Sequence, residues 1–213
     1  MSVASGLIAP GLRAEFPGLR LYWIALDARP RASPPDLRRR LGELSDRYRG
    51  AGVVAMRTQP IPHAYRAFFR QVGVDPDAAR IPSEEAAVRR LIQGGFESRD
   101  TLQDALLIAL VETGVPVGAL DRRSVDVGSL EIRLAVAGDR LGGAGGGSPL
   151  TAGQLIVADA SRVHATLFGS PAPEHAPGPR TRRLVLFAVA VDGVPAIHAE
   201  EALWLAADVL AAG

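Results

Sequence analysis

Cysteine and lysine are both missing from this chain of 213 residues. The lack of cysteine excludes disulfides, thiol catalysis and cysteine-ligated zinc. The lack of lysine makes every one of the 24 basic side chains an arginine. Arginine therefore occupies the positions that lysine would normally hold, and its abundance alone does not indicate RNA binding. The formal net charge of +1 also gives no overall attraction to nucleic acid.

Long apolar runs and targeting signals are missing as well. No run reaches the ~18 apolar residues that a membrane span needs. The first residues, MSVASGLIAPGLRAEFPG, lack a basic stretch followed by a sustained apolar core, so they do not form a signal peptide. We therefore expect a soluble, cytoplasmic protein with no membrane partner. The oligomeric state is left open.

Two common catalytic patterns are also missing. The chain has no Gly-x-Ser-x-Gly elbow for a hydrolase nucleophile. Its four histidines form no His-x-x-x-His pair or similar metal motif. We therefore expect no bound metal and no cofactor.

What is present follows a simple order along the chain. A strand is predicted over 19–28. Four helices are predicted after it: one that begins near Ser33, one over 63–72, one capped by Ser83 and one over 100–114. After Gly114, β-like runs separated by Gly, Pro and Asp follow one another, and a last helix closes the chain. Helices that precede strands without βαβ alternation predict an α+β fold. We expect a single domain over 1–213, in which a small strand–helix element (1–60) packs on a core (61–213).

The histidines and acids offer the first candidates for chemistry. His164 lies inside an apolar strand, where it is either a half-buried strand residue or a catalytic base. His175 lies in a Pro-rich loop and is expected to be solvated. The acids Asp104, Asp121 and Asp159 fall inside or at the ends of apolar segments, where a carboxylate either performs acid–base chemistry or caps a turn.

Several short motifs follow one another in a distinctive order along the chain. They are Tyr65-Arg66, Phe69, Gly73, Pro76, Ser83-x-Glu85, Arg89-Arg90, Asp104, Glu112-x-Gly114-x-Pro116-x-x-x-x-Asp121, LEIRLAVAGDRL and LTAGQLIVADA. Their order resembles a known family, the tRNA-binding and editing domain of the phenylalanyl-tRNA synthetase beta subunit. The match covers roughly Pro62 to the C-terminus, and it is most similar to the free-standing branch, in which this domain is a whole protein.

The resemblance implies a fold and an activity. The family fold is α+β, a three-layer body with a β-sandwich-like centre flanked by helices. In the synthetase, this domain hydrolyses tyrosine that has been wrongly esterified to the phenylalanine tRNA, and its pocket recognises the tyrosine hydroxyl.

The family's working side chains do not carry over to this chain. Its threonine–asparagine pair falls on Leu106 and Leu107, its pocket histidine falls on Gly118, and its glutamate falls near Gly147. The Arg-Arg-Trp-Asn-Trp-Arg-like run of the free-standing branch is missing too. A site built to bond a substrate hydroxyl rejects the analogue without it by ~10⁴–10⁵. The loss of these partners argues against tyrosine-specific editing.

A different polar set remains around the same region. We predict His164, Asp121 and Asp159 as catalytic residues, with His164 activating water for ester hydrolysis. The predicted substrate-binding residues are Arg66, Glu85, Gln103, Asp104 and Gly118. Arg66 either holds a substrate carboxylate or phosphate or pairs with Glu85 or Asp104.

Three functions are compatible with this sequence. The first is hydrolysis of an aminoacyl ester on tRNA in trans. The second is a non-catalytic pocket for an amino acid, a nucleotide or RNA, and the third is a protein–protein module. For RNA binding, the sequence offers one local arginine face, formed by Arg40 and Arg47, which could equally be a solvated helix surface.

Overall fold

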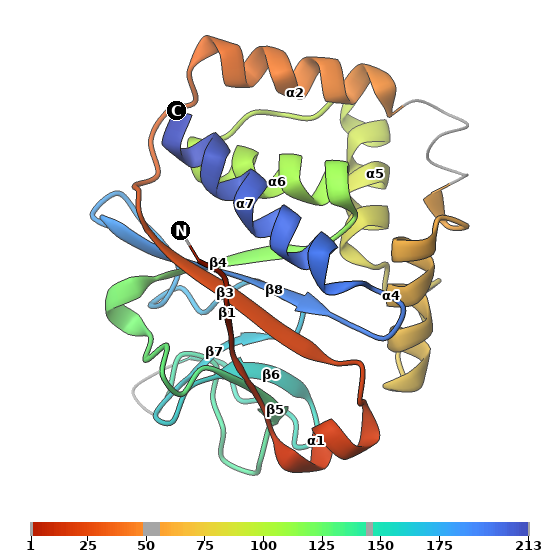
Figure 1. The fold of residues 1–213 in the computed structure, drawn as a ribbon, viewed down its shortest axis with the longest axis vertical. Coiled ribbons are helices and arrows are strands. Elements are labelled where there is room, and N and C mark those ends of the chain that lie inside the picture. Colours follow the sequence, from red (N-terminus) through yellow and green to blue (C-terminus); the bar gives the residue numbers. More distant parts are fainter. Residues whose placement is uncertain (1, 49–55, 144–146, 213) are drawn as a thin grey trace. The chain divides into compact units, whose positions relative to one another are not determined.

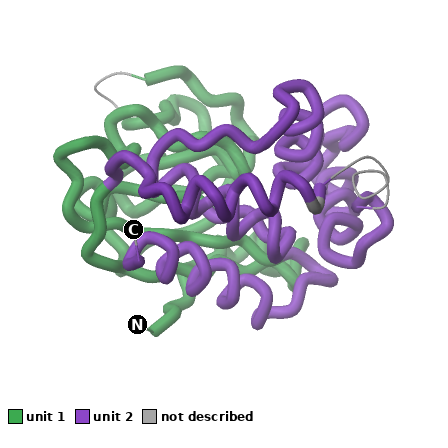
Figure 2. The backbone as a smooth tube through the Cα atoms, turned by 90° about the horizontal axis from the view of Figure 1, so that it is seen from above, with its two compact units in different colours: residues 1–29, 118–190 green, residues 30–117, 191–213 purple. Residues whose placement is uncertain are grey.

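A computed structural model describes residues 2–48, 56–143 and 147–212 of the chain. The chain forms two compact units, each assembled from two separate segments (Figure 2). Unit 1 contains residues 1–29 and 118–190, and unit 2 contains residues 30–117 and 191–213. Residues 1–60 are therefore divided between the units. The division into a 1–60 element and a 61–213 core stays a prediction.

Unit 1 contains a first sheet with the strand order β1–β3–β8–β4 (Figure 1). Its two long strands, β3 (Arg20–Asp27) and β8 (Arg183–Ala190), are antiparallel and pair along their whole length. β8 is buried at every position after Arg183, which explains why its sequence is a continuous apolar run. The outer strands are β1 (Ala4–Ser5) and β4 (Val117–Asp121).

A second sheet in unit 1 has the order β2–β5–β6–β7. β2 (Leu7–Ile8) is parallel to β5 (Glu131–Leu134), and β5, β6 (Leu155–Ala158) and β7 (Val163–Thr166) form an antiparallel meander. Ala135, Ile156, Ala158 and Val163 form a buried cluster on this sheet. The short hairpin between β6 and β7 contains Asp159, and His164 lies within β7.

Unit 2 is helical. It contains α2 (Pro35–Arg47), α4 (Pro60–Gln71), α5 (Pro82–Gln93), α6 (Thr101–Thr113) and α7 (Ala196–Ala212). α6 packs against α2, α5 and, most extensively, α7. This central position accounts for a helix that is apolar nearly all round. Asp100 caps its first turn by accepting from the Leu102 and Gln103 amides, and Gly114 ends it in the left-handed region at φ 76°.

These elements confirm the α+β prediction and the order of helices and strands. Two short strands, the helix α1 (Pro10–Glu15) and the 3₁₀ turn η1 (Arg122–Ser124) were not expected. The cap of α5 was placed wrongly, because the helix already begins at Pro82 and Ser83 lies in its first turn. Proline favours the first helical position, where its missing N–H is not needed. No helix within the described residues is long and apolar enough to cross a membrane.

Candidate functional site

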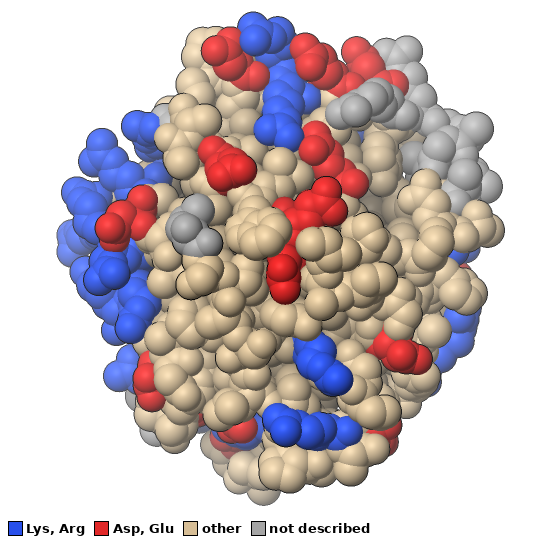
Figure 3. Space-filling view, in the orientation of Figure 1, with Lys and Arg blue, Asp and Glu red and all other residues tan. Residues whose placement is uncertain are grey.

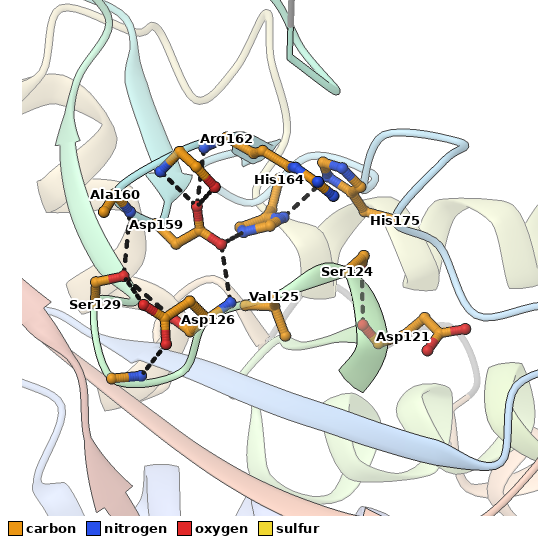
Figure 4. Close-up of polar contacts among 12 residues, drawn as sticks. Asp121, Ser124, Val125, Asp126, Ser129, Asp159, Ala160, Arg162, His164 and His175 are labelled. Carbon is orange, nitrogen blue, oxygen red and sulfur yellow. Dashed lines mark hydrogen bonds and ion pairs between the residues drawn. The ribbon is translucent and has the colours of Figure 1, made fainter.

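Three side chains in unit 1 form a continuous hydrogen-bonded chain, which we call the acid–histidine network. Asp159 Oδ2 lies 2.9 Å from His164 Nε2, and His164 Nδ1 lies 2.9 Å from His175 Nδ1 (Figure 4). His164 is fully buried, and His175 and Asp159 are only 2 % and 4 % exposed. The hairpin after β6 supplies the acid, β7 supplies the first histidine, and the loop before β8 supplies the second.

The carboxylate of Asp159 accepts hydrogen bonds from several donors. Its Oδ1 accepts from the Ser161 and Arg162 amides and the Ser161 hydroxyl, and its Oδ2 accepts from the Asp126 amide and His164. Burial opposes ionisation of Asp159, but the bonds from Asp126, Ser161 and His164 outweigh it and lower its pKa well below the usual range. Asp159 is therefore an anion that only accepts, and His164 must donate to it from Nε2.

The protonation of the two histidines follows from this. Burial lowers the pKa of both His164 and His175, and the positive charge of Arg162 lowers each further. Both rings are therefore neutral near pH 7. Neutral His164 carries its single proton on Nε2, so its Nδ1 accepts from His175 Nδ1–H. His175 is left with an unprotonated Nε2.

That last nitrogen has no hydrogen-bond partner among the described residues. Among the described residues, only Trp23 Nε1 and Ser83 Oγ are completely buried side-chain polar atoms without a hydrogen-bond partner. His175 Nε2 is not one of these atoms, so it is not completely buried, although the residue as a whole is only 2 % exposed. The network thus ends in a basic lone pair supported from behind by a buried anion.

The loop around His175 is held by its backbone. The Ala172 amide donates to His164 O, the His175 amide donates to Ala172 O, and the Asp121 amide donates to His175 O. These bonds hold the ring against His164 and exclude water from most of it. The expectation of a solvated His175 was therefore wrong, because its Pro-rich segment folds back onto β7 and β4 rather than extending into solvent.

Asp121 reaches the network only through its backbone. Its carboxylate accepts from the Arg123 guanidinium, 2.8 Å away, and from the Thr181 hydroxyl, 2.7 Å away. The pairing with Arg123 is the main cause that lowers the Asp121 pKa to about 2. This carboxylate stays ionised and fully paired, so Asp121 positions His175 rather than exchanging protons. The three residues predicted as catalytic thus lie together, joined through His175.

Arg66, predicted to bind substrate, belongs to a different cluster in unit 2. Its Nη1 lies 2.8 Å from Glu84 Oε1, and its Nη2 lies 2.7 Å from Asp77 Oδ1. Arg57 approaches the same two carboxylates at 3.3 Å each. We call these four residues the Arg66 network. It holds Arg66 by internal ion pairs.

The partners expected for Arg66 were wrong. Glu85 is exposed and pairs with Arg80 and Arg89, because the next residue on a helix points to another face. Asp104 bonds instead to the Ser33 and Ser98 hydroxyls, each at 2.6 Å, and to the Arg99 amide. It thereby fixes the segment that leads into α6. Gln103 is exposed on the first turn of that helix.

Gly118 does not provide an open pocket position, because an aromatic ring lies beside it. A Cβ at this residue would lie 2.3–2.9 Å from three ring atoms of Phe187 on the neighbouring strand β8. Only glycine allows so close an approach. Where the resemblance implies a pocket histidine, this chain packs phenylalanine against backbone.

Nothing in the sequence marks His175 as a site residue, apart from its residue type. Its bonding partner His164 lies 11 positions earlier, and no periodicity links the two. Within the described residues, no group of three or more His, Asp or Glu side chains is arranged to hold a metal ion.

Comparison with protein families supplies the wider context. The model of the B3/4 domain matches residues 64–197, which is more than half of the chain. The chain belongs to the B3/4 domain family. This domain occurs in the phenylalanyl-tRNA synthetase beta subunit and related proteins, so the resemblance to that subunit is supported. Among curated proteins, none matches the chain.

Proposed function

We propose that this B3/4 protein hydrolyses an aminoacyl ester on tRNA in trans, with His175 as the general base. The observation that carries the proposal is the free Nε2 of His175 at the end of the acid–histidine network. Membership of the B3/4 family, which links the chain to synthetase beta-subunit-like domains, supports this choice of substrate.

The network can move a proton in a balanced way. His175 Nε2 takes a proton from water as the water oxygen attacks the ester carbonyl carbon. The Nδ1 proton of His175 then shifts to His164 Nδ1, and the resulting imidazolium lies beside the Asp159 carboxylate. When the tetrahedral intermediate collapses, the Nδ1 proton of His164 returns to His175 Nδ1 while His175 Nε2 gives its proton to the departing ribose oxygen, which leaves as a hydroxyl and releases the free amino acid. A positioned base of this kind contributes about 10²–10⁴-fold in rate.

The substrate side chain is selected without recognition of a hydroxyl group. The positions of the family's polar pocket residues hold Leu106, Leu107 and Gly118, and the Phe187 ring packs against Gly118. Apolar contacts alone discriminate between substrate side chains by only about 10–200-fold per methylene. We therefore expect tolerance for several aminoacyl groups.

A panel of mischarged tRNAs tests the proposal. The wild-type protein should release amino acids from at least one of them faster than buffer does, and His175→Asn should lower this rate about 10²–10⁴-fold. His198→Asn is the matched control, because His198 is a partly exposed histidine on α7 that faces Glu201. No release from any tRNA, or full activity in His175→Asn, would overturn the proposal.

A non-catalytic binding protein is the second candidate. It is favoured by the carboxylate of Asp121, a predicted catalytic group that is already bonded to Arg123 and Thr181 within the protein. In that case a non-hydrolysable aminoacyl-adenosine analogue should raise the thermal midpoint, since a ligand at 100 times its Kd adds about 2.7 kcal/mol. Stabilisation without any deacylation would favour this candidate over the enzyme.

A further inference from the structure

Unit 1 carries a group of arginines on its surface, which we call the arginine surface. It consists of two arginines of η1 and three from the end of the loop that leads into β8: Arg122, Arg123, Arg180, Arg182 and Arg183. All but Arg122, which is half-buried, are exposed. In Figure 3, basic side chains gather at the left edge, where η1 and the start of β8 lie in Figure 1, with few acidic side chains among them.

Specific contacts bring these two segments together. Asp121, directly before η1, accepts a 2.7 Å hydrogen bond from Thr181, which lies between Arg180 and Arg182. η1 also packs against β8, the strand that Arg183 begins. Both segments are therefore fixed on the scaffold that also holds His175, whose carbonyl accepts from the Asp121 amide.

Most of this positive charge is not neutralised. Arg123 pairs with Asp121 and Arg183 pairs with Asp27, but no described carboxylate pairs with Arg122, Arg180 or Arg182. Arg122 and Arg182 donate instead to backbone carbonyls. Although the formal net charge of the whole chain is only +1, the arginine surface therefore carries a local excess of positive charge.

The arginines of α2, considered above for RNA binding, differ in this respect. Arg39 pairs with Asp36 and Glu43, and Arg40 pairs with Glu112. The side chain of Arg47 lies outside the described part of the chain. The α2 helix therefore carries both positive and negative side chains, whereas the charge of the arginine surface is mainly positive.

We propose that the arginine surface binds the sugar–phosphate backbone of RNA. Guanidinium groups bind phosphate oxygens through their planar fork, and several unpaired groups on a fixed frame match successive phosphates. The exposed large apolar side chains lie elsewhere in the sequence, at Leu7, Leu91, Ile92, Leu134, Val136, Ile197 and Trp204. A membrane-binding surface would combine basic residues with such apolar anchors, so RNA fits better.

The inference deepens the proposed function, because it rests on tRNA as the substrate and assigns the surface that holds it. Binding can nevertheless be measured without catalysis. The test uses a labelled, uncharged tRNA transcript and the triple variant Arg122→Gln/Arg180→Gln/Arg182→Gln. Its control, Arg38→Gln/Arg39→Gln/Arg89→Gln, loses the same formal charge from the helices of unit 2.

The arginine-surface variant should bind the transcript at least about 10-fold more weakly at 0.1 M salt. The slope of log Kd against log salt concentration should fall by about 2–3, one for each lost phosphate contact. The control variant should bind within about twofold of wild type. Deacylation by the arginine-surface variant should show a raised KM with little change in kcat.

Three results would overturn the inference. They are unchanged binding in the arginine-surface variant, equal weakening in both variants, and arginine-dependent binding to anionic phosphatidylserine vesicles without binding to RNA. RNA binding that depends on these arginines in a protein without deacylase activity would instead refute only the proposed catalysis.

Discussion

The acid–histidine network of unit 1 and the Arg66 network of unit 2 each contain buried charged side chains that are connected by short hydrogen bonds. They differ in what remains available to a ligand. Arg66 presents its guanidinium to Glu84 and Asp77, and Arg57 reinforces both carboxylates. In unit 1, each side chain is also hydrogen-bonded to the next one. The last of them, His175, retains an unpaired Nε2 that is not completely buried.

This difference separates structure from chemistry. A buried ion pair whose donors and acceptors are all matched can stabilise a helix pair and offers nothing to a substrate. A chain of matched groups that ends in one unmatched acceptor can take a proton and return it. Burial and charge at single positions of the sequence do not distinguish the two cases.

The largest expected effect concerns the anion behind the histidines. Asp159→Asn should lower the deacylation rate by about 10²-fold or more, because no carboxylate then stabilises the His164 imidazolium. The acid limb of the pH–rate profile should also move to lower pH, since the negative charge of Asp159 raises the pKa of His164. A variant that loses activity only in proportion to its unfolded fraction, with an unmoved profile, would mean that Asp159 merely braces the hairpin.

Breaking the Arg66 network should affect stability and leave chemistry intact. Arg66→Met removes one partner of a buried pair and leaves Glu84 with only the half-exposed Arg57, so the free energy of unfolding should fall by up to about 3–5 kcal/mol. The thermal midpoint should fall by about 10 °C for a chain of this size. The double variant Arg66→Met/Glu84→Leu should recover part of this loss. Deacylation per folded molecule that falls as in His175→Asn would place Arg66 in the site after all.

A smaller effect is expected where Phe187 meets Gly118. Gly118→Ala places a methyl group within 2.3–2.9 Å of the ring, and such overpacking costs about 1–3 kcal/mol. Chemical denaturation measures the loss, and Phe187→Leu in the same chain should relieve most of it. If Gly118→Ala alone is as stable as wild type, the ring does not occupy the space beside this residue.

The last expected effect is a dependence of stability on pH that the acid–histidine network causes and the Arg66 network does not. His164 and His175 are buried neutral with lowered pKa values, whereas an unfolded histidine titrates near 6.5. Below about pH 6.5 the unfolded chain binds more protons than the folded chain. The free energy of unfolding should therefore decrease as the pH is lowered, by at most about 1.4 kcal/mol per pH unit for each histidine. The lowered pKa of Asp159 acts only below the ordinary carboxyl range, outside this window.

Urea unfolding between pH 5 and 8 measures this dependence. His164→Gln/His175→Gln should flatten the curve, while Arg66→Met should lower it by a constant amount, because arginine stays charged throughout. An equally steep curve in the double histidine variant would assign the dependence to other groups.

Much of the fold was predictable from the sequence, because it follows from local patterns. The cap at Asp100, the apolar run through α6 and the stop at Gly114 gave that helix within a residue or two. The β-like runs separated by Gly, Pro and Asp after Gly114 indicated the strands. β1 and β2 are two residues long and owe their pairing to distant strands, so no local pattern could indicate them.

The candidate site was predictable only in part. Asp159 and His164 lie five residues apart around one hairpin, and their apolar setting drew attention to both. His175 was missed because its burial depends on two backbone hydrogen bonds, one that its carbonyl accepts from the Asp121 amide and one that its amide donates to Ala172 O. Nothing in a Pro-rich segment shows that such bonds form. The choice of Glu84 rather than Glu85 by Arg66 likewise depends on helix orientation, which neighbouring residues in a sequence do not reveal.

The pairing of β3 with β8 has a consequence for biosynthesis. Residues 20–27 leave the ribosome early, yet their hydrogen-bonding partners at 183–190 are translated only after all of α2 to β7. At about 5–20 residues per second, the nascent β3 edge waits many seconds without its neighbour. The central sheet of unit 1 therefore cannot assemble from the N-terminus onward, and a chaperone that shields β3 during elongation should raise the yield of folded protein.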